Sequence, residues 1–591
     1  MASDPSQVHF STGAEGQAAT ERRPYLAVFV GDLGAARLTG LTPVDKDDFA
    51  AVMKKAGIAP KLAIKDPLGG GGDDWEFQLT IDSIRSFDPV QFLTQIDGGR
   101  WRLGVRDKLM ERQSGAITSA ELDTALQAAA AADRSLAWLT APMPSTPASA
   151  APAASPGGSV LDQVDEPTPQ SRVEADVQKL AAGAGAVDAR ISAGESQWTA
   201  QRLARIDREL AMIANTVLKH PEIRRLETAW LSAKYLVDAA DFRAGVRVSI
   251  LSTSREESVD RFIEHVVNPA FNGDIPTPGI VVLDFAAANN PVDIERMDML
   301  AQHAASLPVP VTFPIEADFF NVKSLRLIRN LPNYSGLFDT VQFAKWRTLR
   351  EKPYAKSLAP VVGRFVLRPP HAKRDVKTFT FDETITAIGD IVWGGGHLAL
   401  AVCAVRAYAK NGWPTRMFGA ESGKISDLAV VDNPNDPQNP WGPGDLTLPD
   451  ARLEELPTVG MNLLQAIPKK DYCMLLGGVS AAKPIVTAET PKQQAMLEVS
   501  LPYQQVTNIT SAWICEQMGG LRGKGAADIQ RELLYGLRNL FGLKDAEDEA
   551  AVGIGVGESP NAPGQTLVQV RLTPPSKIVP GGLHIDFGFT V

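Results

Sequence analysis

Cysteine and histidine are scarce in this 591-residue sequence, and neither occurs in a metal-binding pattern. The three cysteines, Cys403, Cys473 and Cys515, lie far apart, are odd in number and show no metal-ligand spacing, a usage typical of a reducing compartment. The seven histidines contain no HExxH motif and no pair four positions apart. We therefore expect no bound metal and no other cofactor.

Long apolar runs and clusters of basic residues are also missing. No uninterrupted apolar run reaches the roughly 18 residues of a membrane span, and residues 1–17 lack the pattern of a secretory signal. The net charge is −10 and no basic stripe occurs, which disfavours binding to nucleic acid. We expect a cytoplasmic protein that neither binds nucleic acid nor inserts directly into a membrane.

Signatures of nucleotide binding and nucleophilic catalysis are absent as well. The glycine run Gly69–Gly72 precedes a predicted strand and lacks a following Lys-Ser/Thr pair, so it predicts a loose hairpin turn. His397 follows three glycines that do not form GxGxxG, and Gly523-Lys524 lacks the other residues of a P-loop. No GxSxG motif occurs. We expect a protein that is not an enzyme.

Residues 141–170 divide the chain. This stretch is dominated by Pro, Ala and Ser and contains no Lys or Arg. It cannot bury enough apolar surface to offset the entropy of ordering, so it predicts a flexible linker. We expect two separately folded units, residues 1–140 and 171–591, tethered and not fused face to face.

The first unit has the pattern of a small α+β domain. A buried strand is predicted within residues 24–34 and a helix within 44–57, where Gly57 is a suitable C-terminal cap. A half-buried strand is predicted at 75–81, and helices at 90–111 and 119–139.

The second unit is larger, with a first lobe at 195–360 and a second at 361–591. Its predicted helices are 195–218, 220–237, 322–329, one around 398–413, 491–500 and 507–518. Its predicted strands are 246–252, 279–285, 310–315, one around 363–370, 471–478, 566–572 and 582–590. The last two form a plausible hairpin. The predicted fold class is mixed α/β: a small α+β domain, a linker, and a multi-lobed region of sheets and helices ending in a β-hairpin.

The helix at 220–237 poses a question of function. Ile223, Leu226 and Trp230 share its apolar face, and Pro221 suits the first turn. By pattern alone, His220 could be a catalytic base, a metal ligand or an architectural residue.

The segment LKHPEIRRLETAWLSAKYLV, residues 218–237, resembles the signature of the large subunit of the type VI secretion contractile sheath (TssC). The matching positions are His220, Pro221, Glu222, Leu226, Glu227, Trp230, Tyr235, Leu236 and Val237. Further similarities follow in the family's order: Trp346, Arg347, Leu349, Arg350, Arg364, Arg368, Trp393, Gly394, Gly412, Trp413, Arg416, Gly419, Gly423, Asp471, Ser480, Lys483, Pro484, Leu501, Pro502 and Tyr503.

The region before the linker resembles the small sheath subunit (TssB). The segments VHFSTG, PYLAVFVGDLG, VDKDDFAAVM and SFDPVQFLTQI are similar to successive pieces of that family. Where the family has Asp-Phe-x-Pro, this chain has Phe87-Asp88-Pro89. The two subunits are normally separate chains, so a fusion would hold them at a one-to-one ratio.

The resemblance implies a structural subunit that assembles in the cytoplasm as a helical tube and contracts to propel an inner tube. The implied partners are further copies of the chain, a hexameric inner-tube ring protein, an envelope-anchored baseplate and, for recycling, an AAA+ unfoldase. His220 is then expected to start a helix. The residues expected in the structural core are Ile223, Leu226, Trp230, Trp346, Trp393 and Trp413.

Assembly is predicted to use strand pairing between protomers. A candidate donor strand near the N-terminus contains Val8 and Phe10, and the C-terminal hairpin is the candidate acceptor. The hairpin residues concerned are Val568, Val570, Leu572, Leu583, Ile585, Phe587 and Phe589.

Two alternatives stay open. The first is a sheath of another contractile injection machine or phage-tail-like particle. The second is an enzyme with a scattered active site, for which His265, His303, Glu316 and Asp318 form the best candidate cluster.

Overall fold

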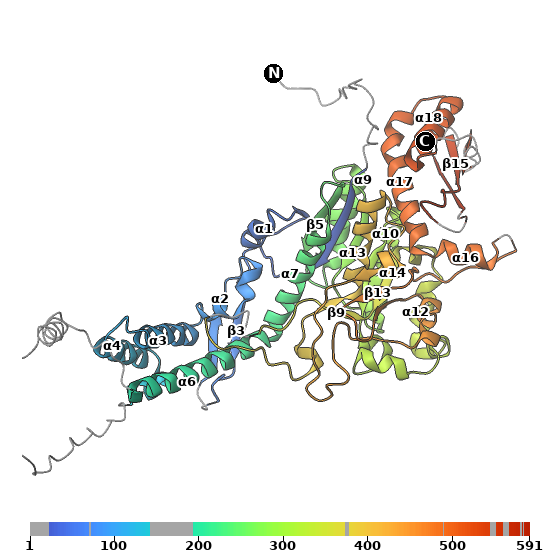
Figure 1. Cartoon of the computed structure of the whole chain (residues 1–591). Helices are drawn as coiled ribbons and strands as arrows, with labels where there is room; N and C mark the ends of the chain where they lie inside the picture. Colours follow the sequence, from blue (N-terminus) through green and yellow to red (C-terminus); the bar gives the residue numbers. More distant parts are fainter. Residues whose placement is uncertain are drawn as a thin grey trace, which may run out of the picture.

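The computed structural model describes residues 23–69, 73–141, 193–372, 378–488, 490–543, 551–558, 566–579, 582 and 584–590. The predicted linker after Ala141 lies outside the described residues, as do Val8, Phe10 and Leu583. The described chain has the predicted mixed α/β fold, in which helices cover a mixed sheet (Figure 1).

A nine-stranded sheet forms the centre of the molecule. Its strands, in spatial order, are β11 (Lys424–Ile425), β13 (Cys473–Leu475), β12 (Asn462–Ala466), β8 (Leu358–Val362), β7 (Val311–Ile315), β6 (Pro278–Leu283), β1 (Tyr25–Gly31), β5 (Val246–Ser252) and β2 (Thr42–Val44). The pairs from β12 to β5 are all parallel. Antiparallel strands flank them at both sides, where β2 pairs with β5 and β13 with β12.

The first strand of the chain lies inside this sheet. β1 pairs along its whole length with β5, from Tyr25 opposite Val246 to Gly31 opposite Ser252. On its other side it pairs with β6. The expectation of two separately folded units is therefore wrong, because a strand from before the linker fills a central position among strands from after it.

Both faces of β1 are buried, and each belongs to a different hydrophobic core. Tyr25, Ala27 and Phe29 join a cluster with residues of α7 (Pro221–Ala239) and α13 (Gly396–Asn411). The alternate residues face α8 (Ser258–Phe262) and α10 (Pro291–Ser306). This two-sided burial accounts for the uninterrupted apolar sequence YLAVFVG.

The other elements before the linker are helix α1, a β-hairpin and an elongated helical arm. α1 (Phe49–Ala56) ends at Gly57, whose left-handed φ of 67° caps the helix as predicted. β3 (Lys61–Ile64) and β4 (Trp75–Gln78) pair antiparallel on either side of the glycine run. The arm consists of α2 (Pro89–Leu93), α3 (Asp97–Gln113) and α4 (Ser119–Ala132), packed along α6 (Ala193–Leu218) (Figure 1).

Three predicted helices differ from the observed ones. The helix expected at 90–111 is broken, because Ile96 adopts an extended backbone and separates α2 from α3. The helix expected at 119–139 ends at Ala132, where Asp133 caps a short 3-10 turn, Arg134–Thr140. The helix expected at 322–329 is a 3-10 turn, Leu325–Asn330, preceded by the left-handed Asn321 and the extended Ser324.

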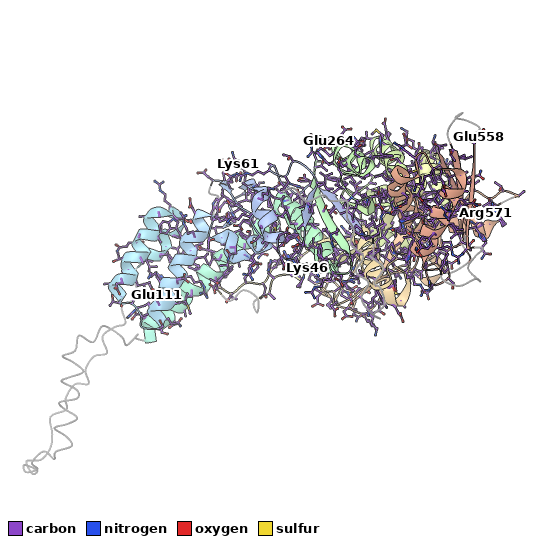
Figure 2. All side chains as sticks on the ribbon, turned by 90° about the horizontal axis from the view of Figure 1, so that it is seen from above. Lys46, Lys61, Glu111, Glu264, Glu558 and Arg571 are labelled. Carbon is purple, nitrogen blue, oxygen red and sulfur yellow. The ribbon has the colours of Figure 1, made fainter. Side chains whose placement is uncertain are left out.

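A C-terminal lobe has its own hydrophobic core. It contains α17 (Leu501–Leu521), α18 (Ala526–Phe541), β14 (Val552–Glu558), β15 (Thr566–Leu572) and β16 (Ile585–Thr590). The predicted hairpin β15–β16 is present, and β14 pairs with the other side of β15 to make a three-stranded sheet. Figure 2 shows Glu558 and Arg571 of this sheet at one end of the molecule and Glu111 of the arm at the other.

The other described elements are short and lie mostly around the central sheet. They are α9 (Asn268–Asn272), α11 (Tyr334–Phe338), α12 (Ala344–Arg350), β9 (Arg364–Val366), β10 (Trp393–Gly395), α14 (Gly419–Ser422), α15 (Glu455–Thr458) and α16 (Lys492–Glu498).

Candidate functional site

His220 caps the start of α7. Its backbone is extended, and its Nδ1 accepts the main-chain N–H of Glu222 at 3.3 Å. Ile223, Leu226 and Trp230 then lie almost completely buried on the inner face. The indole N–H of Trp230 donates to the main-chain carbonyl of Leu33 at 2.9 Å. The helix therefore acts as a connector between the two parts of the chain.

The four tryptophans expected in a core lie in four different clusters. Trp230 belongs to the cluster around α7, and Trp346 to the one on the opposite face of the sheet, where its N–H donates to Val459 O at 3.2 Å. Trp393 belongs to a small cluster beside β9. Trp413 stacks on Phe541 in the C-terminal lobe, with ring centroids 5.1 Å apart. Each tryptophan thus anchors a separate region.

Two segments that carry the family resemblance meet in a buried ionic cluster. Glu227 of α7 accepts Arg368 Nε at 2.5 Å, and the same guanidinium reaches Glu383 at 2.7 Å. Both carboxylates are almost fully buried. Although burial alone would raise the pKa of Glu383, the Arg368 guanidinium holds that pKa below its ordinary value. Arg224 of α7 also approaches Glu383, at 3.8 Å, so two guanidinium groups balance the two carboxylates. The cluster therefore ties α7 to a distant loop and leaves no free acid or base.

A second set of ion pairs joins the arm to α6. Arg102, Arg106 and Arg112 of α3 contact Glu209, Asp207 and Glu195 of α6 at 2.7–2.8 Å. The arginines ascend along α3 while their partners descend along α6, so the two helices are antiparallel. The Arg102 and Arg112 side chains are 0% exposed. Because α3 precedes the linker and α6 follows it, these pairs set the register between the two parts of the chain.

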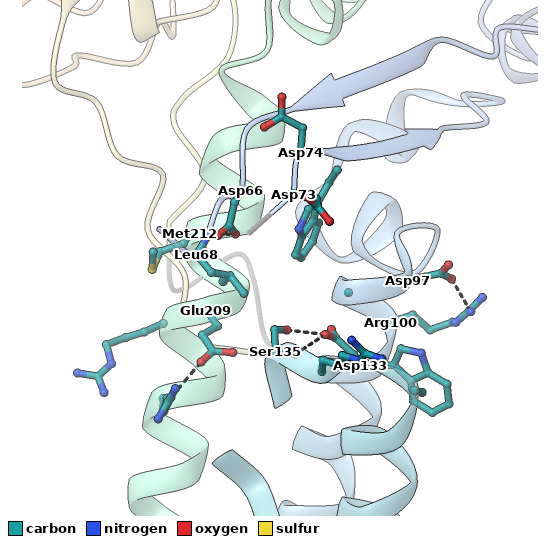
Figure 3. A pocket seen from close by; sticks show the side chains of 17 residues that line it. Asp66, Leu68, Asp73, Asp74, Asp97, Arg100, Asp133, Ser135, Glu209 and Met212 are labelled. Atoms are coloured by element: carbon teal, nitrogen blue, oxygen red, sulfur yellow. Dashed lines mark hydrogen bonds and ion pairs between the residues drawn. The ribbon is translucent and has the colours of Figure 1, made fainter. Parts of the chain in front are cut away.

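A cavity of 1080 Å³ lies beside these ion pairs, between the β3–β4 hairpin, α3 and α6. Figure 3 shows Asp133 next to Ser135, and Asp97 next to Arg100, on its walls. Burial would raise the pKa of Asp133, but hydrogen bonds from Ser135 and Arg102 hold it below its ordinary value. Asp133 is thus an ionised acceptor with its partners in place, not a general acid.

The residues of the scattered-site alternative are not brought together. His303 lies in the last turn of α10, before β7 begins, whereas Glu316 and Asp318 follow the end of β7. His265 contacts its chain neighbour instead: its Nε2 lies 3.4 Å from Oε2 of Glu264. Glu316 instead approaches Arg364 at 3.6 Å, and Arg364 binds Asp445 at 2.8 Å. Sequence reasoning missed Asp445, because no local motif marks it. It noted His397 only for the glycines that precede it, and missed its contact with Asp284, whose Oδ1 lies 3.1 Å from His397 Nε2.

The described part of the chain contains neither a metal site nor a helix that could span a membrane. No group of three His, Cys, Asp or Glu side chains there is placed to hold a metal ion. Within the same residues, every helix is too short or too polar to span a bilayer.

The C-terminal sheet has open strand edges, and most of its apolar side chains are buried against the lobe. Val568, Val570 and Leu572 of the central strand β15 are at most 2% exposed, because they pack against α18 and its neighbours. Ile585 is also buried, while Phe587 and Phe589 are partly buried. Among the described strands, the outer edges of β14 and β16 have no neighbour. Sequence reasoning missed β14 because its alternating glycines weaken the strand pattern.

Comparison with known families and proteins places both parts of the chain. The family model of VipA from the type VI secretion system matches residues 7–143. The VipB model, described as the tail sheath N-terminal domain, matches residues 200–482. The type VI secretion system sheath protein TssC1 of Pseudomonas aeruginosa is 25% identical over 324 residues, which are 51% of this chain and 65% of that protein. The match therefore spans less than two thirds of the relative. The resemblances of the two regions to the small and large sheath subunits are confirmed.

Solved sheath structures are also similar. The sheath of the PVC extracellular contractile injection system in its contracted state is 12% identical, with a TM-score of 0.32, over 59% of this chain and 78% of that one. The contracted sheath of the anti-feeding prophage is 9% identical, with a TM-score of 0.34, over 58% and 78%.

Proposed function

We propose that this chain, which joins a VipA-type region to a VipB-type region, is the structural subunit of a contractile sheath of the type VI secretion class. Copies of the chain assemble in the cytoplasm as a helical tube, and contraction of the tube propels an inner tube. The observation that carries the proposal is the position of β1 between β5 and β6, since it makes the two regions one protomer.

The geometry suits a mechanical part. The large tryptophans are buried in the hydrophobic cores, and Arg368 is paired with Glu227 inside the protomer. These contacts stiffen the protomer. Neighbouring protomers need contacts that persist while the lattice changes shape. Main-chain hydrogen bonds between strands supply such contacts, because a donated strand can swing on the segment that carries it.

We infer that residues around Val8 and Phe10 of one protomer pair with a free edge of the β14–β16 sheet of another. A small sheet with two open edges is a ready acceptor, and its edges are otherwise a liability for aggregation. Further partners of the proposed sheath are the hexameric inner-tube ring protein, the baseplate and an AAA+ unfoldase for recycling.

Electron microscopy of the purified full chain tests the proposal. We expect hollow, striated tubes in negative stain and co-purification of the inner-tube protein from the native host. A chain that stays monomeric at every concentration and salt condition tested would refute the sheath assignment. Tubes that enclose a different inner tube would favour another contractile injection machine.

A further inference from the structure

An extended segment between β9 and β10, residues 378–390, crosses the junction between α6 and α7, and we call it the strap. Its side chains alternate between core and surface as in a β-strand: Phe379, Phe381 and Glu383 are buried, whereas Thr380, Asp382 and Thr384 are exposed. The two phenylalanines belong to the same hydrophobic core as α7, and their ring centroids lie 5.7 Å apart. The strap is therefore anchored to the protomer by its inner face.

The junction that the strap crosses interrupts a long helical rod. Figure 1 shows α6 lying along the arm and α7 reaching the central sheet. Lys219 and His220 separate the two helices, and the backbone of His220 is extended. Pro221 begins α7 and has no N–H to donate to a carbonyl of α6. Helices commonly bend at such prolines, so the angle of this junction depends on contacts from outside the two helices.

The first part of the strap contacts α6 at two points. The main-chain N–H of Thr380 donates to Asp207 Oδ2 at 3.1 Å, and that of Thr384 donates to Asn215 Oδ1 at 2.7 Å. The step from Asp207 to Asn215 rises about 12 Å in a helix. The step from Thr380 to Thr384 rises about 13 Å in an extended chain. The strap therefore runs parallel to α6 and in register with it.

The last residue of the strap contacts the junction and the start of α7. Lys219 Nζ donates to Asp390 Oδ2 at 2.9 Å, and the Arg224 guanidinium donates to the main-chain carbonyl of Asp390 at 2.6 Å. Arg368 also joins Glu383 of the strap to Glu227 of α7. One segment thus holds the helices on both sides of the junction.

Asp207 connects the arm to the same network. Its Oδ1 accepts Arg106 Nε of α3 at 2.7 Å, while its Oδ2 accepts the N–H of Thr380. Because α3 is also ion-paired with α6 on either side of this contact, these two helices form one rigid pair. The direction of α6 therefore sets the direction of the whole arm.

We propose that the strap fixes the angle between α6 and α7, and with it the direction of the arm relative to the central sheet. The apolar core beneath the junction holds the helices together, but apolar packing has no preferred direction. The polar contacts at Asp207, Asn215, Lys219 and Arg224 are directional and define the angle. Without them, α6 swings about Lys219–Pro221. This inference concerns a single chain and does not depend on sheath formation.

Spin labels on both sides of the junction test the proposal. Cysteine is introduced at Gln201 of α6 and at Asp238 near the end of α7, both of which are exposed. Cys515 is replaced by Ser because its thiol is exposed, whereas Cys403 and Cys473 are buried. A straight helix between the labelled positions would span about 55 Å. A change of angle therefore changes the distance that double electron–electron resonance measures.

The double substitution Asn215→Ala, Lys219→Met removes the acceptor of the Thr384 N–H and the cation that contacts Asp390. We expect the distribution of label distances to become at least twofold wider. Lys410→Met, Asn411→Ala removes the same two kinds of side chain at the exposed end of α13 and should leave the distribution unchanged. Equal widths in all three proteins would overturn the proposal.

Hydrogen exchange separates loss of the strap contacts from general loosening. In the double variant, the amide of Thr384 should exchange at least tenfold faster, while the amides of β6 in the central sheet stay protected. A wide distance distribution together with fast exchange in β6 would overturn the proposal, because the whole fold would then be loosened. Should the double variant fail to fold, the single variant Asn215→Ala, which keeps Lys219, gives the same comparison.

Discussion

The indole N–H of Trp230 donates to the main-chain carbonyl of Leu33, 197 positions earlier in the chain, and both residues are completely buried. Leu33 follows β1 and belongs to the region before the linker, whereas Trp230 is the central residue of α7. This hydrogen bond, together with the pairing of β1 with β5 and β6, makes one folded unit of two regions that each resemble a separate subunit.

Replacing Trp230 by Phe should lower the free energy of unfolding by about 1–3 kcal/mol, because the buried carbonyl of Leu33 loses its donor. The remaining ring keeps its edge-on contact with Phe49, whose centroid lies 5.8 Å away. Urea unfolding measures the change. Trp101→Phe, at a partly buried site, is the control, and an equal loss in both variants would contradict a special role for the hydrogen bond.

Cutting the chain between residues 142 and 170 should leave the two fragments associated. The fragment that contains β1 is held on both sides by strands of the other fragment, and α3 is held by its ion pairs to α6. After cleavage at an inserted protease site, we expect co-elution in gel filtration until denaturant unfolds both. Separation into two folded monomers would show that the shared sheet does not hold them.

Arg102→Ala should destabilise the protein by about 3–5 kcal/mol, since Asp133 and Glu209 would keep their charges without the buried guanidinium between them. Arg100→Ala removes a neighbouring but exposed pair with Asp97 and should cost about 0–1 kcal/mol. Chemical denaturation of both variants gives the comparison. Similar values would mean that the buried pair contributes no more than the surface pair.

Asp390 should contribute stability that is lost in acid. Although burial opposes it, hydrogen bonds from Lys219 and Thr386 lower the pKa of Asp390 from 3.8 to about 2. A carboxyl whose pKa is lower in the folded state stabilises the protein above its unfolded pKa, and this contribution vanishes as the pH falls through the folded pKa. Asp390→Asn should therefore be less stable by about 1 kcal/mol, after allowance for solvent screening, near neutral pH.

The difference in the free energy of unfolding between Asp390→Asn and the unaltered chain should vanish as the pH falls from 4 to 2. Urea unfolding at intervals across this range checks the sign. A gap that stays constant down to pH 2 would show that the lost stability comes from the amide substitution itself and not from the charge.

Deleting residues 1–12 should abolish tube assembly while the protomer keeps its melting temperature. The reason is that the proposed donor strand, with Val8 and Phe10, serves a neighbour and not its own chain. Electron microscopy and thermal melting are the two measurements. Normal tubes would disprove strand donation, and a lower melting temperature would mean that the segment stabilises its own protomer.

The sequence by itself determined the local elements. His220, Pro221 and the spacing of Ile223, Leu226 and Trp230 predict the start and inner face of α7, because capping and helical periodicity depend on residues within a few turns. The hairpin β15–β16 was equally predictable from alternation. Family resemblance indicated the class of protein from motifs scattered along the chain.

Only the tertiary structure decided where these elements meet. The apolar strand Tyr25–Gly31 fits any doubly buried position in a sheet, and its place is set by partners more than 200 residues away in the sequence. The pairing of Glu227 with Arg368 has the same origin, since each residue alone looks like a solvated charge. Long-range packing selects among arrangements that local patterns leave equivalent, and here it turned two apparent domains into one protomer.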